Sequence, residues 1–104
     1  MKLKTVNYNY SKISKKYSME QKKFKEDINV TNNIYLFFKD NECLYIGETG
    51  TTLKDRCYRH TEKLSEKDFF KNANIIYIIE LDDCIGKEER EKIKTTFKSV
   101  YKIK

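Results

Sequence analysis

The stretch from Asn33 to His60 reads N-I-Y-L-F-F-K-D-N-E-C-L-Y-I-G-E-T-G-T-T-L-K-D-R-C-Y-R-H. It contains two β-rich runs, 33–38 and 42–47, separated by three polar residues that predict a hairpin turn. Asn41 suits the left-handed position of such a turn. With this turn, Tyr35 lies directly opposite Tyr45 on one face of the hairpin. A two-residue turn would put the two phenols on opposite faces.

The residues after the hairpin predict a helix, a strand and a second helix. Thr52 and Asp55 have the spacing of a capping box, which predicts a helix that continues to about residue 64. Residues 74–81 are almost continuously apolar, as is typical of a central strand. The last helix is expected to begin near Gly86. The expected fold class is therefore α+β: an α/β sandwich with a three-stranded, mostly antiparallel sheet flanked by helices.

The positive charge is concentrated at the N-terminus. The 104 residues carry a net charge of +6, and residues 1–30 contain eight Lys against three acidic residues. We interpret residues 1–30 as a basic arm with a short strand and a helix over about 19–27, for which Ser18 and Gln21 have the spacing of a capping box, and residues 31–104 as the main domain. A basic arm attracts polyanions such as nucleic acid, ribosomes or anionic lipid.

Composition excludes several classes of protein. No apolar run approaches the roughly 20 residues that a membrane helix needs, and no signal peptide follows the first lysines. The three widely spaced cysteines favour reduced thiols in the cytoplasm over a disulfide framework. The sequence contains no C-x-x-C motif, so a zinc site is not expected. We therefore expect neither a membrane protein nor a secreted or zinc-stabilised module.

Several side chains are candidates for chemistry, each with a plainer alternative. The two phenols on one hairpin face are either core packing or a proton-handling pair. Arg56 and His60 lie four residues apart on the predicted helix and could hold a phosphate, or could simply be solvated. Glu89 falls on the apolar stripe of the last helix, so we expect it to point inward or at a pocket at the edge of the core, and to need a cation or strong hydrogen-bond donors. The alternative is that an acidic residue merely suits the first helical turn.

Taken in order, these residues resemble the GIY-YIG nuclease family. Asn33-Ile34-Tyr35 stands at the first motif, and Tyr45-Ile46-Gly47 matches the second. An Arg with a His four residues later, and a Glu with an Ile four residues later in a closing helix, also follow the family pattern. Asn33 departs from the Gly that the family often has, and no Asn follows Asn74, although the family often has one after the metal-binding helix.

The resemblance implies a metal-dependent endonuclease that hydrolyses DNA phosphodiester bonds. Tyr35 would be the general base or would orient the attacking water, and Tyr45 would support it. Arg56 would bind the scissile phosphate, and His60 would assist proton transfer or hold Tyr35. Glu89 would be the only protein ligand of one Mg²⁺ or Mn²⁺ ion. The residues expected to contact nucleic acid are Gly47, Thr49, Lys54, Lys4, Lys12, Lys15 and Lys16.

The sequence is also compatible with two other functions, and its composition suggests a cellular setting. The same scaffold could serve a catalytically silent nucleic-acid-binding protein, or a small basic protein-interaction module. The expected partner of the nuclease is DNA, without a membrane, and specificity would come from a homodimer or a partner protein. The richness in Lys and Asn suggests an AT-rich genome, so we expect the cytoplasm of a bacterium or of a phage-infected host cell.

Overall fold

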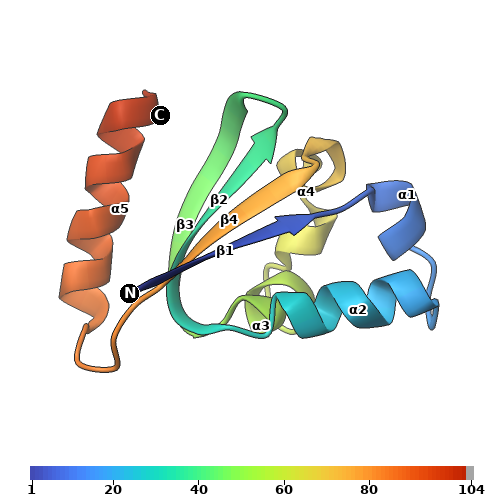
Figure 1. Ribbon diagram of the computed structural model, residues 1–104, viewed down its shortest axis with the longest axis horizontal. Helices are drawn as coiled ribbons and strands as arrows, with labels where there is room; N and C mark the ends of the chain where they lie inside the picture. The colour runs from blue at the N-terminus through green and yellow to red at the C-terminus, as the bar shows by residue number, and fades with distance from the viewer. Residues whose placement is uncertain (103–104) are drawn as a thin grey trace.

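The computed structural model describes residues 1–102 and has an α+β architecture in which one antiparallel sheet lies between two layers of helices (Figure 1). The strands follow the order β1-β4-β2-β3 across the sheet. The elements are β1 (Lys2–Asn7), α1 (Tyr10–Ile13), α2 (Met19–Asp27), β2 (Thr31–Lys39), β3 (Glu42–Thr52), α3 (Leu53–Tyr58), η1 (Leu64–Glu66), α4 (Asp68–Asn72), β4 (Ile75–Glu80) and α5 (Lys87–Tyr101). The predicted fold class is confirmed.

The sheet has four strands in the described chain, so the prediction of three was wrong. β1 pairs antiparallel with β4 along its whole length, from Lys2 opposite Glu80 to Asn7 opposite Ile75. Only Val6 of this strand is buried. A lysine-rich edge strand with one inward apolar residue has too weak an alternation to be recognised as part of a sheet.

The first thirty residues belong to the same folded core as the rest of the chain. The Ser18 hydroxyl accepts the amide of Gln21 and caps α2, as the sequence predicts. Phe24 and Ile28 are buried in the same cluster as Tyr35. This segment therefore adds a strand and two helices to the core beside which the candidate site lies.

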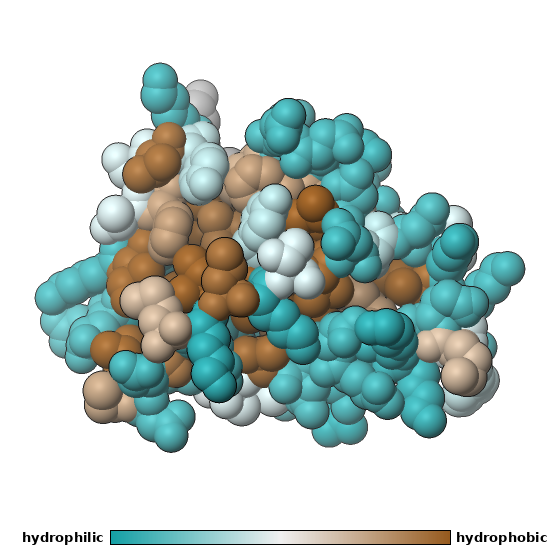
Figure 2. Space-filling model, viewed as in Figure 1, coloured by the Kyte–Doolittle hydropathy of each residue, from teal (hydrophilic) through white to brown (hydrophobic). Residues whose placement is uncertain are grey.

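The two helical layers divide the core into two clusters. The helices α1 to α4 cover the face that carries Tyr35 and Phe37, whereas α5 covers the face that carries Ile34 and Leu36. Figure 2 shows apolar side chains gathered between α5 and the sheet, while the surface over α2 is mostly hydrophilic. Successive residues of β2 thus belong to different clusters, as the period of a β-strand requires.

The hairpin turn is tighter than predicted. Residues 40 and 41 form the turn, because Lys39 pairs with Glu42. Asp40, not Asn41, has the positive φ of 52°. A regular two-residue turn would have placed Tyr35 and Tyr45 on opposite faces of the hairpin. The register shifts by one residue between Phe37 and Phe38, and this bulge returns the two side chains to the same face. The predicted three-residue turn was therefore wrong, and so was the direct pairing of Tyr35 with Tyr45, but the two tyrosines do share one face of the hairpin.

The two later helices α3 and α5 begin where the sequence predicted, but α3 is shorter than expected. The Thr52 hydroxyl accepts the amide of Asp55, which confirms the predicted cap of α3. The helix ends at Tyr58 and not near residue 64, because the Asp55 carbonyl accepts the amides of both Arg59 and His60 and the regular hydrogen-bond pattern stops there. The last helix begins after Gly86, as predicted.

Candidate active site

Tyr35 and Tyr45 lie on the same face of the hairpin. Tyr35 pairs directly with Gly47, and Tyr45 pairs with Phe37, so the two tyrosines are diagonal and not directly opposite. Their ring centroids are 6.3 Å apart with an angle of 27° between the rings. Tyr45 also stacks on Phe69, with centroids 4.2 Å apart. β2 and β3 therefore bring both phenols together, with Tyr45 held between Tyr35 and α4.

The glycine of the Y-I-G motif makes room for the ring of Tyr35. A Cβ atom built on Gly47 would come within 2.5 Å of Tyr35 Cε2, and closer still to its Cζ and hydroxyl oxygen. No side chain larger than hydrogen fits there without moving the tyrosine. A glycine lets another group approach the backbone closely, and at Gly47 that group is the aromatic ring of Tyr35.

Burial keeps the phenol of Tyr35 protonated. Only 1% of the residue is exposed, and this burial raises the pKa of its hydroxyl above the ordinary value of 10. Arg56 lies beside the hydroxyl and lowers the same pKa, but its effect is smaller than that of burial. Tyr35 is therefore a neutral phenol at physiological pH, able to donate a hydrogen bond, and not a phenolate base.

Arg56 is the arginine that the described chain leaves without an acidic partner. Arg90 pairs with Glu48 at 2.7 Å, and Arg59 approaches Asp55 at 3.8 Å. Arg56 is half-buried on α3 and makes no such ion pair within residues 1–102. A guanidinium placed beside a buried phenol and left unneutralised is well suited to an anionic ligand such as a phosphate.

His60 lies beyond the end of α3, so it is not on the helix face that the sequence predicted. Its side chain is exposed, and Nδ1 accepts the backbone amide of Glu62 at 3.1 Å. In the neutral imidazole this places the proton on Nε2. The ring has no hydrogen bond to Tyr35 or Arg56 within the described part of the chain, although it follows the same helix.

Glu89 is exposed, which corrects the expectation that it points into the core. Ile93 and Phe97 of α5 pack on the sheet, and the neighbouring Arg90 takes the inward position in the first turn. The two other acidic residues of this helix are paired, Glu88 with Lys92 and Glu91 with Lys94. Glu89 is thus the one carboxylate of α5 without an ion pair among the described residues.

The structure does not bring Glu89 into the tyrosine cluster. α5 packs on the face of the sheet opposite to that of Tyr35. No group of three His, Cys, Asp or Glu side chains suited to a metal lies anywhere in residues 1–102. A protein-bound cation here would take a single carboxylate from the chain, and Mg²⁺, which keeps most of its water ligands, is compatible with such a site.

A network of polar side chains that the sequence did not predict lies at the first turn of α5. Arg90 Nε donates to Glu48 Oε2, and Arg90 Nη1 donates to Asn32 Oδ1, both at 2.7 Å. The side chains of Arg90 and Glu48 are only 12% and 13% exposed. The one signal in the sequence is Gly50, because a glycine lets another group approach the backbone closely. A Cβ atom on Gly50 would lie 2.8 Å from Arg90 Nη2.

The residues predicted to contact nucleic acid differ in exposure. Gly47 and Thr49 are buried, and the Thr49 hydroxyl accepts the amide of Thr51, so both serve the interior of the hairpin. Lys54 is half-buried at the start of α3. The four N-terminal lysines are exposed: Lys4, Lys12, Lys15 and Lys16. Contact of any of these residues with DNA stays a prediction.

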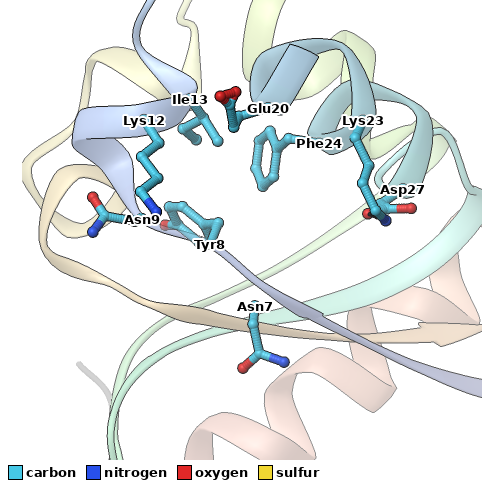
Figure 3. Close-up of a pocket in the computed structure, with 9 residues that line it drawn as sticks. All are labelled: Asn7, Tyr8, Asn9, Lys12, Ile13, Glu20, Lys23, Phe24 and Asp27. Atoms are coloured by element: carbon cyan, nitrogen blue, oxygen red, sulfur yellow. Dashed lines mark hydrogen bonds and ion pairs between the residues drawn. The ribbon is translucent and has the colours of Figure 1, made fainter. Parts of the chain in front are cut away.

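A hollow between the end of β1 and the helices α1 and α2 is separate from the tyrosine cluster (Figure 3). Tyr8 and Phe24 line its apolar part, and its volume is about 380 Å³. The charged residues at its rim are balanced, two lysines with two acidic residues, and Lys23 is paired with Asp27. Balanced charge makes this hollow a poor phosphate site, so the tyrosine cluster is the better candidate.

The tyrosine cluster lies within the part of the chain that matches a known family. The chain matches the GIY-YIG catalytic domain over residues 31–102, from the first residue of β2 to just beyond α5. No curated protein and no solved structure matches it. None of the helices in residues 1–102 is long and apolar enough to cross a membrane. The match covers well over half of the chain, and the protein therefore belongs to the GIY-YIG family of nuclease domains.

Proposed function

We propose that this protein is a metal-dependent endonuclease that hydrolyses DNA phosphodiester bonds. The family is one of nucleases that act on DNA. The observation that carries the proposal is the unpaired guanidinium of Arg56 beside the buried hydroxyl of Tyr35. A cation beside a hydrogen-bond donor offers the kind of ligands that a phosphate requires.

The proposed mechanism follows from the charge state of each group. Arg56 binds the scissile phosphate and stabilises the negative charge that develops on it. The neutral phenol of Tyr35 orients the attacking water or donates to a phosphate oxygen, and Tyr45 supports its position. His60, with an accessible imidazole, moves a proton to or from solvent. Tyr35 is not assigned as a phenolate base, because burial raises its pKa.

The cation in this proposal is one Mg²⁺ or Mn²⁺ ion held by Glu89. The carboxylate is exposed and has no ion pair within the described residues, so it is available to a cation. When bound, such an ion neutralises charge on the phosphate and activates water. Because α5 covers the other face of the sheet, we expect bound DNA to supply the remaining contacts between the ion and the tyrosine cluster.

A plasmid-nicking assay in low salt tests the proposal. We expect the wild-type protein to nick DNA with Mg²⁺ or Mn²⁺ and to stop when a chelator is added. Glu89→Gln should lower the rate at least a hundredfold, because the amide is neutral and binds a divalent cation poorly. The matched control is Glu88→Gln, whose carboxylate is one residue away but is paired with Lys92; it should cut at nearly the wild-type rate.

Two results would contradict this assignment. If Glu88→Gln loses cutting and Glu89→Gln keeps it, the wrong carboxylate has been identified. If the wild-type protein binds DNA without cutting it under any metal, the protein is a silent binder on the same scaffold.

The exposed lysines of the N-terminal segment are proposed to follow the DNA backbone. Replacing Lys4, Lys12, Lys15 and Lys16 with Gln should weaken binding and flatten its salt dependence, because each phosphate contact contributes about 0.9 to the slope of log K against log salt. Fluorescence anisotropy at several salt concentrations measures both quantities. A control with the same loss of charge replaces four lysines near the hairpin turn and the end of α5, remote from Glu89: Lys39, Lys71, Lys98 and Lys102. Equal slopes for the two variants would show that only net charge matters.

We further propose that specificity comes from outside this small domain. A chain of 104 residues has little surface for reading a long DNA sequence after its core is formed. A second copy of the chain or a partner protein would supply the remaining contacts, in the cytoplasm of a bacterium or of a phage-infected cell.

A further inference from the structure

The contacts of Arg90 connect α5 to two strands of the sheet. Its guanidinium reaches Glu48 on β3 and Asn32 on β2 at the same time, each at 2.7 Å. These contacts use two different nitrogen atoms of one planar group, so the orientation of the guanidinium is fixed. Because the side chain is 12% exposed, solvent can compete little for these bonds.

Asn32 extends the connection to the loop before α5. Its Nδ2 donates to the carbonyl oxygens of Asp82 and Ile85, at 2.8 and 3.1 Å, while its Oδ1 accepts from Arg90. The residue has a positive φ of 49°, a conformation that Asn tolerates better than most residues. Only an amide side chain can donate to two carbonyls and accept from a guanidinium in one place.

Gly50 brings the same helical turn close to the start of α3. The Arg90 guanidinium lies against the backbone of this glycine, where a Cβ atom would be 2.8 Å from Nη2. Two residues later, Thr52 caps α3, the helix that carries Arg56. The first turn of α5 is therefore held against the segment that leads from the Y-I-G strand to the candidate phosphate ligand.

We propose that Asn32, Glu48 and Arg90 are positioning residues that hold the first turn of α5, and with it the carboxylate of Glu89, in fixed relation to the segment that carries Arg56. This inference rests on the proposed function for the role of Glu89, but the positioning itself can be measured without metal or DNA. Glu48 is committed to Arg90 by this arrangement and is not a metal ligand.

Arg90→Lys tests the positioning most cleanly, because it keeps the charge and most of the length of the side chain. An ammonium group cannot reproduce the fork that reaches both Asn32 and Glu48. In the free protein, we expect hydrogen exchange of the amides in residues 90–93 to accelerate about tenfold, with β2 and β4 unchanged. Lys92→Gln, which breaks an exposed pair on the solvent-facing side of the same helix, is the control and should change neither. Unchanged exchange, or equal acceleration throughout the protein, would overturn the positioning role.

The second measurement concerns Mn²⁺, titrated into the protein–DNA complex and followed by electron paramagnetic resonance. Arg90→Lys alone should weaken Mn²⁺ binding about tenfold. In a protein that already carries Glu89→Gln, the same substitution should not weaken Mn²⁺ binding further, because Arg90 acts through Glu89. Equal weakening in both backgrounds would overturn the inference. If Glu89→Gln itself leaves Mn²⁺ binding unchanged, the proposed metal ligand is wrong, while the exchange result still decides whether the three residues position α5.

Discussion

Arg56→Leu is expected to lower the rate of DNA cleavage about a thousandfold while the fold stays intact. The removal of one donor that stabilises transition-state charge typically costs 10²- to 10³-fold, and a guanidinium offers two donors and a full charge. The folded state should tolerate the change, since within residues 1–102 no acidic side chain depends on Arg56 for its neutralisation. Single-turnover cleavage, with thermal unfolding measured in parallel, tests both statements.

Arg59→Leu is the matched control for this prediction. Arg59 follows the same helix three residues later, and it is exposed and approaches Asp55 at 3.8 Å. An exposed pair of this kind contributes little to stability, so this variant should fold and cut nearly as the wild type does. Arg56→Lys should fall between the two, because it keeps the charge without the planar fork. Equal losses in Arg56→Leu and Arg59→Leu would mean that only the positive charge of α3 matters.

The features that the sequence predicted correctly are local ones. The hydroxyls of Ser18 and Thr52 cap their helices as the capping boxes indicated, because each cap involves residues only three positions apart. The strand at Ile75–Glu80 lies between two neighbours in the sheet, as its continuous apolar character suggested. Such signals depend on neighbours along the chain and can be read without the fold.

The features that the sequence did not predict depend on distant partners. β1 has one buried residue, and its place in the sheet depends on pairing with β4, whose residues lie far away in the sequence, as Asn7 opposite Ile75 shows. Glu89 appeared to be the inward residue of α5, but the helix is rotated so that Arg90 faces the sheet, where Glu48 and Asn32 bind it. A spacing of four residues leaves such a rotation open, and only the partners across the interface decide it.

The candidate site was predicted unevenly for the same reason. The common face of Tyr35 and Tyr45 follows from the strand period once the register is known, and it holds although the predicted turn was wrong. The relation of Arg56 to Tyr35 could not be read from the sequence, because it depends on how α3 crosses the sheet. The protonated state of Tyr35 also requires the fold, since burial by residues from several elements raises its pKa.

Gly47→Ala should destabilise the protein by about 3 kcal/mol, the upper end of the usual cost of an overpacked core. The added methyl group would overlap the ring of Tyr35, which is fully enclosed and cannot turn away without moving its neighbours. Urea unfolding measures the loss. Gly86→Ala provides the control, because a Cβ atom there meets nothing within 4 Å, and its effect should be at most about 1 kcal/mol, since Ala is a poorer N-cap for α5 than Gly.

A double-mutant cycle identifies Tyr35 as the origin of this cost. Tyr35→Ala alone should cost about 4 kcal/mol, as removal of a large buried ring usually does. In that background Gly47→Ala should be nearly neutral, because its methyl group enters the space that the ring has left, giving a coupling of about 3 kcal/mol. Tyr35→Phe keeps the Cζ and Cε2 atoms that the methyl group meets, so Gly47→Ala should remain costly there. Additive losses in the Tyr35→Ala background would show that Gly47 is required for its backbone and not for the tyrosine that lies over it.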